Sequence, residues 1–204
     1  MKTLVYDIKE LNNDSLKKID EVAMILRNGG VVAFPTETVY GLGADALNHK
    51  AVSKIFKAKG RPSDNPLIVH ISDIEQCYSL TNSFTETIKK LAERFWPGPL
   101  TIIVPKSNIV PDITTGGLDT VAIRMPDHPV ALELIRRSGC PVAAPSANLS
   151  GRPSPTKGEH VMEDMFGKID AIIKSGDCKV GIESTILDLT EDAPSILRPG
   201  ILTP

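Results

Sequence analysis

Hydrophobic positions along the chain follow two periods, which together predict an alternation of strands and helices. Short apolar runs bounded by turn residues are typical of buried strands, and spacings of three and four are typical of amphipathic helices. The apolar runs predict strands over residues 3–8, 31–34, 67–71, 100–104, 121–123, 141–144, 169–173, 185–189 and 195–197. The helical spacing predicts helices over residues 15–28, 50–57, 84–95, 129–137 and 159–166. Because several strands follow one another with only turns between them, we expect an α/β fold with a twisted, mixed sheet and flanking helices.

Composition narrows the class of protein. The chain has 204 residues, 41% hydrophobic and 24% charged, which predicts a single soluble globular domain over residues 1–204. A net charge of −2 and 4% aromatic residues argue against nucleic-acid binding as the sole role, without excluding a local basic cleft. The three cysteines form no C-x-x-C pair, which favours reduced thiols. No signal peptide is evident, and no apolar run approaches the ~18 residues that span a bilayer, so we expect a cytoplasmic protein without membrane contact.

A proline- and glycine-rich segment, residues 59–66, carries groups that suit an anion. Pro62 favours an extended conformation at Arg61, and residues two apart in an extended chain point the same way. Lys59 and Arg61 would then converge on one phosphate, the lysine as a point charge and the arginine as a planar fork. An ordinary solvated basic turn is the competing interpretation.

A second segment of this kind, residues 145–151, lies far along the chain. Ser146 and Asn148 have the same spacing and offer two neutral donors. Either segment alone favours an ordinary turn, because such turns are common. Their joint occurrence instead favours a nucleotide site, and the chain has no G-x-x-x-x-G-K-[ST] sequence that would make it a P-loop protein.

Residues 35–43 gather hydroxyl groups and a carboxylate beside two glycines. The stretch from Gly41 to Ala46 fits the relaxed dinucleotide pattern G-x-G-x-x-A, but Pro35 ends the preceding strand too early for the required strand–turn–helix. The segment is either a polar turn entering a second strand or a wall of a small polar pocket. The anion-binding residues elsewhere favour the pocket.

Two further residues lie in or at the end of apolar strands. His70 alone is more typical of a core or edge histidine than of a catalytic one. Arg124 is harder to place without a ligand, because burying an unpaired guanidinium costs several kcal/mol. A substrate carboxylate or phosphate would offset that cost. Ser184 and Arg198 flank the last strands. Ser184 alone is as consistent with a turn cap as with a role in the site, and Arg198 alone is as consistent with a surface cation.

Other chemistries have no sequence signal. The four histidines lack metal-ligand spacing, and no G-x-S-x-G elbow is present. Covalent catalysis is therefore not indicated.

The chain resembles the YrdC-like threonylcarbamoyl-AMP synthases from about Gly29 to Ile201. The resemblance rests on these motifs, in order: F-P-T-E-T-V-Y-G-L-G, K-x-K-G-R-P-x-x-N-P-L, V-A-I-R-M-P, P-S-A-N-x-S-G, S-T-I-L-D-L and L-R-P-G. It implies a twisted α/β fold around a large concave cavity lined by positive charge. It also implies the short, single-domain form of the family, without the extra C-terminal domain of the longer form.

The resemblance implies that L-threonine, bicarbonate and ATP give threonylcarbamoyl-AMP and pyrophosphate. The threonylcarbamoyl transferase machinery would then use the product to make N6-threonylcarbamoyladenosine at position 37 of tRNA. ATP is here a substrate, with Mg²⁺ held mainly through its phosphates. The implied ATP contacts are Lys57, Lys59, Arg61, Asn65, Thr120, Ser146, Asn148, Ser154 and Arg198. The implied threonine contacts are Thr36, Thr38, Tyr40, His70, Arg124, Ala144 and Ser184.

Catalysis in this scheme needs positioning, neutralised phosphates and exclusion of water, but no nucleophile from the protein. Lys59 and Arg61 are expected to carry it, with Lys57 and Lys59 as alternatives for the main phosphate lysine. A fragile carbamate predicts a closed pocket and a moving loop near Gly60 or Gly151.

Two other functions compete with the synthase. One is a carbamoyltransferase that handles a carbamoyl-adenylate, which the absence of zinc-type cysteine pairs disfavours. The other is an RNA-binding protein, which the net charge disfavours as the sole role. Weak RNA binding in addition to catalysis stays an expectation.

Overall fold

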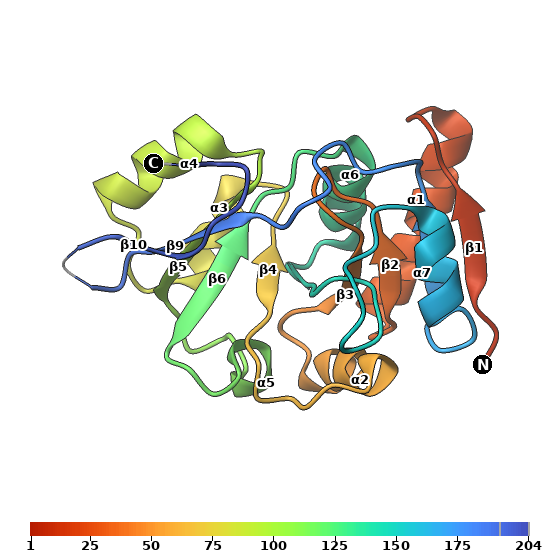
Figure 1. Cartoon of the computed structure of the whole chain (residues 1–204), viewed down its shortest axis with the longest axis horizontal. Helices are drawn as coiled ribbons and strands as arrows, with labels where there is room; N and C mark the ends of the chain where they lie inside the picture. The colour runs from red at the N-terminus through yellow and green to blue at the C-terminus, as the bar shows by residue number, and fades with distance from the viewer. Residues whose placement is uncertain (192, 204) are drawn as a thin grey trace.

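A computed structural model describes residues 1–191 and 193–203, and these residues form a mixed sheet flanked by helices (Figure 1). The strands are β1 (Leu4–Asp7), β2 (Val32–Phe34), β3 (Gly41–Asp45), β4 (Ile68–His70), β5 (Leu100–Pro105), β6 (Thr120–Arg124), β7 (Val142–Ala143), β8 (Ala171–Lys174), β9 (Thr185–Asp188) and β10 (Ser195–Arg198). The helices are α1 (Asn13–Arg27), α2 (His49–Lys59), α3 (Ile74–Leu80), α4 (Glu86–Phe95), α5 (Asp112–Thr115), α6 (Pro129–Ser138) and α7 (Gly158–Met165).

The strand order brings distant segments together. Across the sheet it runs β1-β8-β2-β3-β7-β4-β6-β5-β9-β10. Parallel pairs join β1 to β8, β2 to β8, β4 to β6 and β5 to β9, and the other neighbours are antiparallel. The predicted mixed α/β sheet is therefore confirmed, and the C-terminal strands lie beside strands from the middle of the chain.

Alternate residues of the central strands pack on opposite sides of the sheet. In β2, Ala33 belongs to a hydrophobic core that also takes residues from α2, α3, α4 and α7. Its neighbours Val32 and Phe34 belong to a second core with α1 and α6. Because side chains alternate along a strand, a short apolar run can fill both cores.

The helices and strands predicted from the hydrophobic pattern are confirmed, with ends that differ by a few residues. The pattern missed α3 and α5, which are too short to show a helical period. It also gave residues 41–45 only as one of two alternatives, and they form β3.

Glycine explains why β3 is hard to recognise. A Cβ at Gly43 would lie 2.6 Å from Cγ1 of Val142 and 2.7 Å from Cε1 of Phe34. The strand can pass between β2 and β7 because it has no side chain at this position. Two of the five residues of β3 are glycine, so the strand lacks the continuous apolar run that predicts a buried strand, although it lies in the middle of the sheet.

Candidate active site

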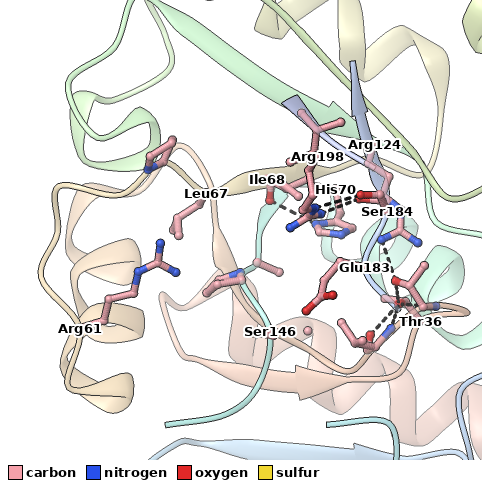
Figure 2. A pocket seen from close by; sticks show the side chains of 17 residues that line it. Thr36, Arg61, Leu67, Ile68, His70, Arg124, Ser146, Glu183, Ser184 and Arg198 are labelled. Carbon is pink, nitrogen blue, oxygen red and sulfur yellow. Dashed lines mark hydrogen bonds between the residues drawn. The ribbon is translucent and has the colours of Figure 1, made fainter. Parts of the chain in front are cut away.

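A cavity of about 750 Å³, including its open mouth, lies where β3, β4, β6, β7, β9 and β10 meet. Figure 2 shows Arg61 on one side of it and His70, Arg124 and Arg198 on the other. The sequence-predicted residues that line it are Thr36, Thr38, Arg61, His70, Arg124, Ala144, Ser146, Ser184 and Arg198. Residues from the N-terminal, central and C-terminal parts of the sequence thus converge on one cavity.

Arg124 is held firmly at the end of β6. Its side chain is 4% exposed, and its Nε donates to the carbonyl of Gly98 at 3.2 Å. Nη1 donates to Oγ1 of Thr38 at 2.9 Å, and Nη2 donates to Oε1 of Glu37 at 2.5 Å. Burial lowers the pKa of Arg124, and the charge of Glu37 opposes that shift. The guanidinium therefore remains charged and oriented at the cavity wall.

His70 lies beside Arg124, because β4 and β6 are parallel and pair these two residues. It is 4% exposed, and its Nδ1 lies 3.2 Å from the carbonyl oxygen of Ile68. Burial and the nearby charge of Arg124 lower the pKa of His70 to about 3. A neutral imidazole is thus expected at neutral pH, suited to hydrogen bonding rather than to charge pairing.

The segment between β2 and β3 forms a hydroxyl-lined wall. Thr36 Oγ1 donates to the carbonyl of Val39 at 2.6 Å and lies 3.0 Å from Oγ1 of Thr38. Tyr40 does not line the cavity: its hydroxyl donates to the carbonyl of Gly176 at 2.7 Å and accepts from the backbone N–H of Ser175 at 3.0 Å. Burial raises the pKa of Tyr40 to about 12. Tyr40 therefore anchors the loop that follows β8.

Ser184 and Arg198 come together from the two C-terminal strands. Arg198 donates from Nε to the carbonyl of Ser184 at 3.0 Å and from Nη2 to its Oγ at 3.1 Å. Ser184 Oγ also lies 2.7 Å from Oγ1 of Thr101 on β5. Burial lowers the pKa of Arg198, and Glu183 opposes the shift. These contacts fix a second cation in the cavity wall.

The expectation that Lys59 and Arg61 point the same way from an extended chain is wrong. Lys59 is the last residue of α2, and Gly60 follows in the left-handed conformation with φ 61°. This reversal lets Arg61 line the cavity while the Lys59 side chain is buried. The pattern misled because Pro62 restrains the residue before it and says nothing of Lys59.

Lys59 instead holds the loop after β7. Its Nζ donates to the carbonyls of Ser146 and Asn148, the latter at 2.6 Å. Asn148 turns its amide to the carbonyls of Leu149 and Arg152, at 2.9 and 2.7 Å. Neither Lys59 nor Asn148 lines the cavity, whereas Ser146 does.

The remaining predicted residues also lie outside the cavity lining. Lys57 is exposed near Met1 and Lys168 in a different surface hollow, and Asn65 is exposed. Thr120 is half-buried at the start of β6. Ser154 lies behind the wall, with its Oγ donating to Oε1 of Glu183 at 2.6 Å. Their roles stay predictions.

Two acidic residues of the site were given no role from the sequence. Glu37 is the partner of Arg124, and Glu183 lines the cavity. Glu37 lies within the first motif and Glu183 directly precedes S-T-I-L-D-L, and in both places a role in the site was assigned to the neighbouring hydroxyl residues instead. Over residues 1–191 and 193–203, no group of three or more His, Cys, Asp or Glu side chains is placed to hold a metal ion. Within the same ranges no helix is both long and apolar enough to cross a membrane.

Comparison with known proteins finds a matching family and close relatives. A family model described as "Telomere recombination", covering Sua5, YciO and YrdC, matches residues 24–200. A Bacillus subtilis protein named threonylcarbamoyl-AMP synthase is 59% identical over 91% of this chain and 54% of its own length. A Methanocaldococcus jannaschii relative is 36% identical over 99% of this chain and 95% of its own.

A solved structure matches closely. The crystal structure of Pyrococcus abyssi Sua5 complexed with L-threonine superimposes with a TM-score of 0.94 at 56% identity. The match covers 97% of this chain and 58% of that protein. This chain thus spans little more than half the length of the Bacillus and Pyrococcus proteins.

Proposed function

This chain belongs to the Sua5–YciO–YrdC family, and from that premise we propose that it joins L-threonine, bicarbonate and ATP into threonylcarbamoyl-AMP and pyrophosphate. The observation that carries the proposal is the cavity itself, where Arg61, Arg124 and Arg198 converge with a row of fixed hydroxyl groups. The similar Pyrococcus protein was crystallised with L-threonine. The same cavity would here hold threonine and the triphosphate side by side.

Arg124 suits the threonine carboxylate. Its guanidinium is fixed by Glu37, Thr38 and Gly98 and still lines the cavity. A planar guanidinium can pair with both oxygens of a carboxylate. Thr36, Thr38, neutral His70 and Ser184 would supply the hydrogen bonds that orient the rest of the amino acid, with the Ala144 backbone as one more wall.

Arg61 and Arg198 suit the phosphates. Arg61 lines the cavity just after α2, and Arg198 lines it from β10. Ser146 adds a neutral hydroxyl to the same lining. Two guanidinium groups would neutralise the charge that develops as pyrophosphate leaves. Lys59 would act indirectly here, by holding the loop that presents Ser146. The described residues offer no acidic metal cage, so Mg²⁺ would be carried by the phosphates and water.

The reaction then needs no covalent intermediate on the protein. The threonine nitrogen adds to bicarbonate and water leaves, which gives a carbamate. A carbamate oxygen attacks the α-phosphorus of ATP, and pyrophosphate departs. The protein contributes positioning and a partly closed cavity that limits hydrolysis of the carbamate. The product would be passed to the machinery that modifies tRNA, with residues 1–204 acting as one YrdC-like unit.

The test is pyrophosphate release from ATP and bicarbonate, with and without L-threonine, combined with mass detection of the product. We expect threonine-dependent release and a threonylcarbamoyl-AMP mass. Release that depends on carbamoyl phosphate and ignores threonine would favour the carbamoyltransferase instead. No turnover together with tight, salt-sensitive tRNA binding would favour an RNA-binding protein.

A further inference from the structure

Glu183 stands out among the charged residues of the cavity. The described lining residues include three arginines, and Glu183 alone among them carries a carboxylate. Figure 2 shows this carboxylate projecting into the cavity. An acidic group in this wall balances part of the charge of Arg198, but it also weakens the binding of an anion, because like charges repel.

One hydrogen bond holds the carboxylate, and backbone bonds anchor the loop before it. Ser154 Oγ donates to its Oε1 at 2.6 Å, while Oε2 accepts no hydrogen bond within the described residues. Backbone bonds from Val180 to Glu37 at 2.8 Å and from Gly181 to Thr38 at 3.1 Å anchor the preceding loop. The hydrogen bond from Ser154, and more weakly Arg198, lower the pKa of Glu183, so it is ionised at neutral pH.

Glu37, the other acid near the cavity, is not available for this purpose. Its Oε1 pairs with Arg124, and its Oε2 is buried without a hydrogen-bond partner among the described residues. Its side chain is 5% exposed and does not line the cavity. A cationic group in the cavity would therefore meet Glu183.

We propose that Glu183 binds the ammonium group of the amino-acid substrate and accepts the proton that this group must lose before it attacks bicarbonate. The proposal rests on the proposed function and adds a catalytic residue to it. An amino acid brings one positive and one negative charge, and the cavity offers a carboxylate as well as Arg124 to match them. Charge complementarity of this kind fixes which end of a zwitterion faces which wall.

The reaction moves one proton from the substrate to the protein before the carbon–nitrogen bond forms. The ammonium gives one proton to Glu183, leaving a neutral amine and a carboxylic acid. The amine nitrogen forms a bond to the carbon of bicarbonate, and one N–H proton leaves with the hydroxyl group as water. The carbamate carries the single negative charge that bicarbonate brought. Glu183 is half-buried at the wall, so it returns its proton to solvent.

The test uses Glu183→Gln, which keeps the size of the side chain and an oxygen for Ser154 but removes the charge. Loss of a charge-assisted hydrogen bond should lower kcat/KM for L-threonine by ~10-fold or more, with KM for ATP changed less than about 2-fold. Glu163→Gln, the same substitution at an exposed position outside this cavity, should behave as wild type.

The reverse reaction separates catalysis on the amine from general damage. Threonylcarbamoyl-AMP and pyrophosphate form ATP without any ammonium group taking part in the phosphoryl step. Glu183→Gln should keep this rate within about 3-fold of wild type while the forward rate falls. Equal losses in both directions, or no forward loss, would overturn the role of Glu183.

Binding calorimetry tests the role of Glu183 separately from the synthase activity. Wild type should bind L-threonine at least ~10-fold more tightly than 2,3-dihydroxybutanoate, which lacks the ammonium. In Glu183→Gln the ratio of the two dissociation constants should be closer to one. If the ratio narrows but wild type releases no pyrophosphate with threonine, the ammonium site is supported and the synthase assignment fails. If wild type makes threonylcarbamoyl-AMP but the ratio is unchanged in the variant, the synthase stands and the proposal for Glu183 is overturned.

Discussion

Lys59 lies in the last turn of α2 with its ammonium between the carbonyl oxygens of Ser146 and Asn148. Burial and the charge of Arg61 lower the pKa of Lys59 from 10.5 to about 8. A buried cation that meets two carbonyl dipoles keeps its hydrogen bonds but loses much of its hydration. Its position explains how a loop far along the sequence presents Ser146 to the cavity.

The shifted pKa predicts a pH dependence of stability. Between pH 8 and 10.5 the unfolded chain still binds the Lys59 proton while the folded chain has begun to release it. The free energy of unfolding should therefore rise with pH across this window. From pH 8 to pH 10.5 the free energy of unfolding of wild type should rise by on the order of 1–3 kcal/mol relative to that of Lys59→Met. Urea denaturation at each pH measures this difference.

Lys57 offers a matched control on the same helix. It is exposed, and Lys57→Met should give a stability curve parallel to that of wild type. If Lys59→Met also runs parallel to wild type between pH 8 and 10.5, the ammonium is not buried in the folded protein as described.

Arg61 is expected to matter for turnover and little for stability. It follows the helix cap and lines the cavity, with no hydrogen-bond partner among the described side chains. Arg61→Ala should lower kcat by roughly 100-fold, as expected for removal of one electrostatic contact to the transition state. The free energy of unfolding should change by less than about 0.5 kcal/mol. Arg136→Ala, on an exposed face of α6, is the control, and full activity of Arg61→Ala would remove it from the phosphate site.

At the scale of elements, α2 and α5 both end at a glycine with the same backbone conformation. The cap of α2 is Gly60 with φ 61°, and the cap of α5 is Gly116 with φ 62°. Both glycines adopt the left-handed conformation that other residues adopt at a cost. The surroundings differ, because a Cβ at Gly60 would meet open space, whereas one at Gly116 would lie 2.8 Å from the carbonyl oxygen of Asp64.

The two glycines therefore predict different costs for the same substitution. Gly60→Ala should lower the free energy of unfolding by about 1 kcal/mol, from backbone strain alone. Gly116→Ala should cost more than that, on the order of 2–4 kcal/mol, because the segment of residues 64–66 must also move. Denaturation of the two variants side by side measures the difference. Equal costs would mean that α5 does not pack on this segment.

At the scale of the whole molecule, cations gather in one place on a chain whose net charge is −2. The sheet order joins β6 to the pair β9–β10 through β5, and Arg61, just after α2, lies on the opposite side of the cavity (Figure 2). Arg61, Arg124 and Arg198 thus line a common cavity, although they are far apart in sequence. Glu37 neutralises Arg124, so Arg61 and Arg198 supply the field that the low-dielectric walls focus on an anionic ligand.

Such focusing predicts that ATP binding weakens as salt is added. Raising KCl from about 50 mM to about 500 mM should increase Kd for ATP by ~10-fold or more, because screening shortens the range of the field. L-threonine, with no net charge, should respond far less. Arg61→Ala should flatten the dependence for ATP, measured by calorimetry at each salt concentration. An equal response for both ligands would argue against a cationic triphosphate site.

Much of the fold could be predicted because its signal is local. The apolar runs that became β2 and β8, and the spacing that became α1 and α6, lie within single elements. Arg124 lines the cavity, but the sequence argument that a ligand must offset the cost of its burial is not needed, because Glu37 pairs with its guanidinium. The direction of a side chain was not predictable where it depends on a hydrogen-bond or ion-pair partner elsewhere in the chain. Lys59 has the same sequence signal as Arg61, yet only the Arg61 side chain lines the cavity.

The sequence by itself determined the fold class, the order of most elements, the motifs that place the chain in its family, and the segments from which the site is built. Tertiary structure decided which side chains of those segments meet. The carboxylates of Glu37 and Glu183 are chemically alike, but one neutralises Arg124 behind the wall and the other projects into the cavity. The physical reason is that hydrophobic periodicity is a property of neighbouring residues. Side-chain direction and ion pairing depend on strand pairings between residues that lie a hundred or more positions apart in several cases, such as β2 with β8.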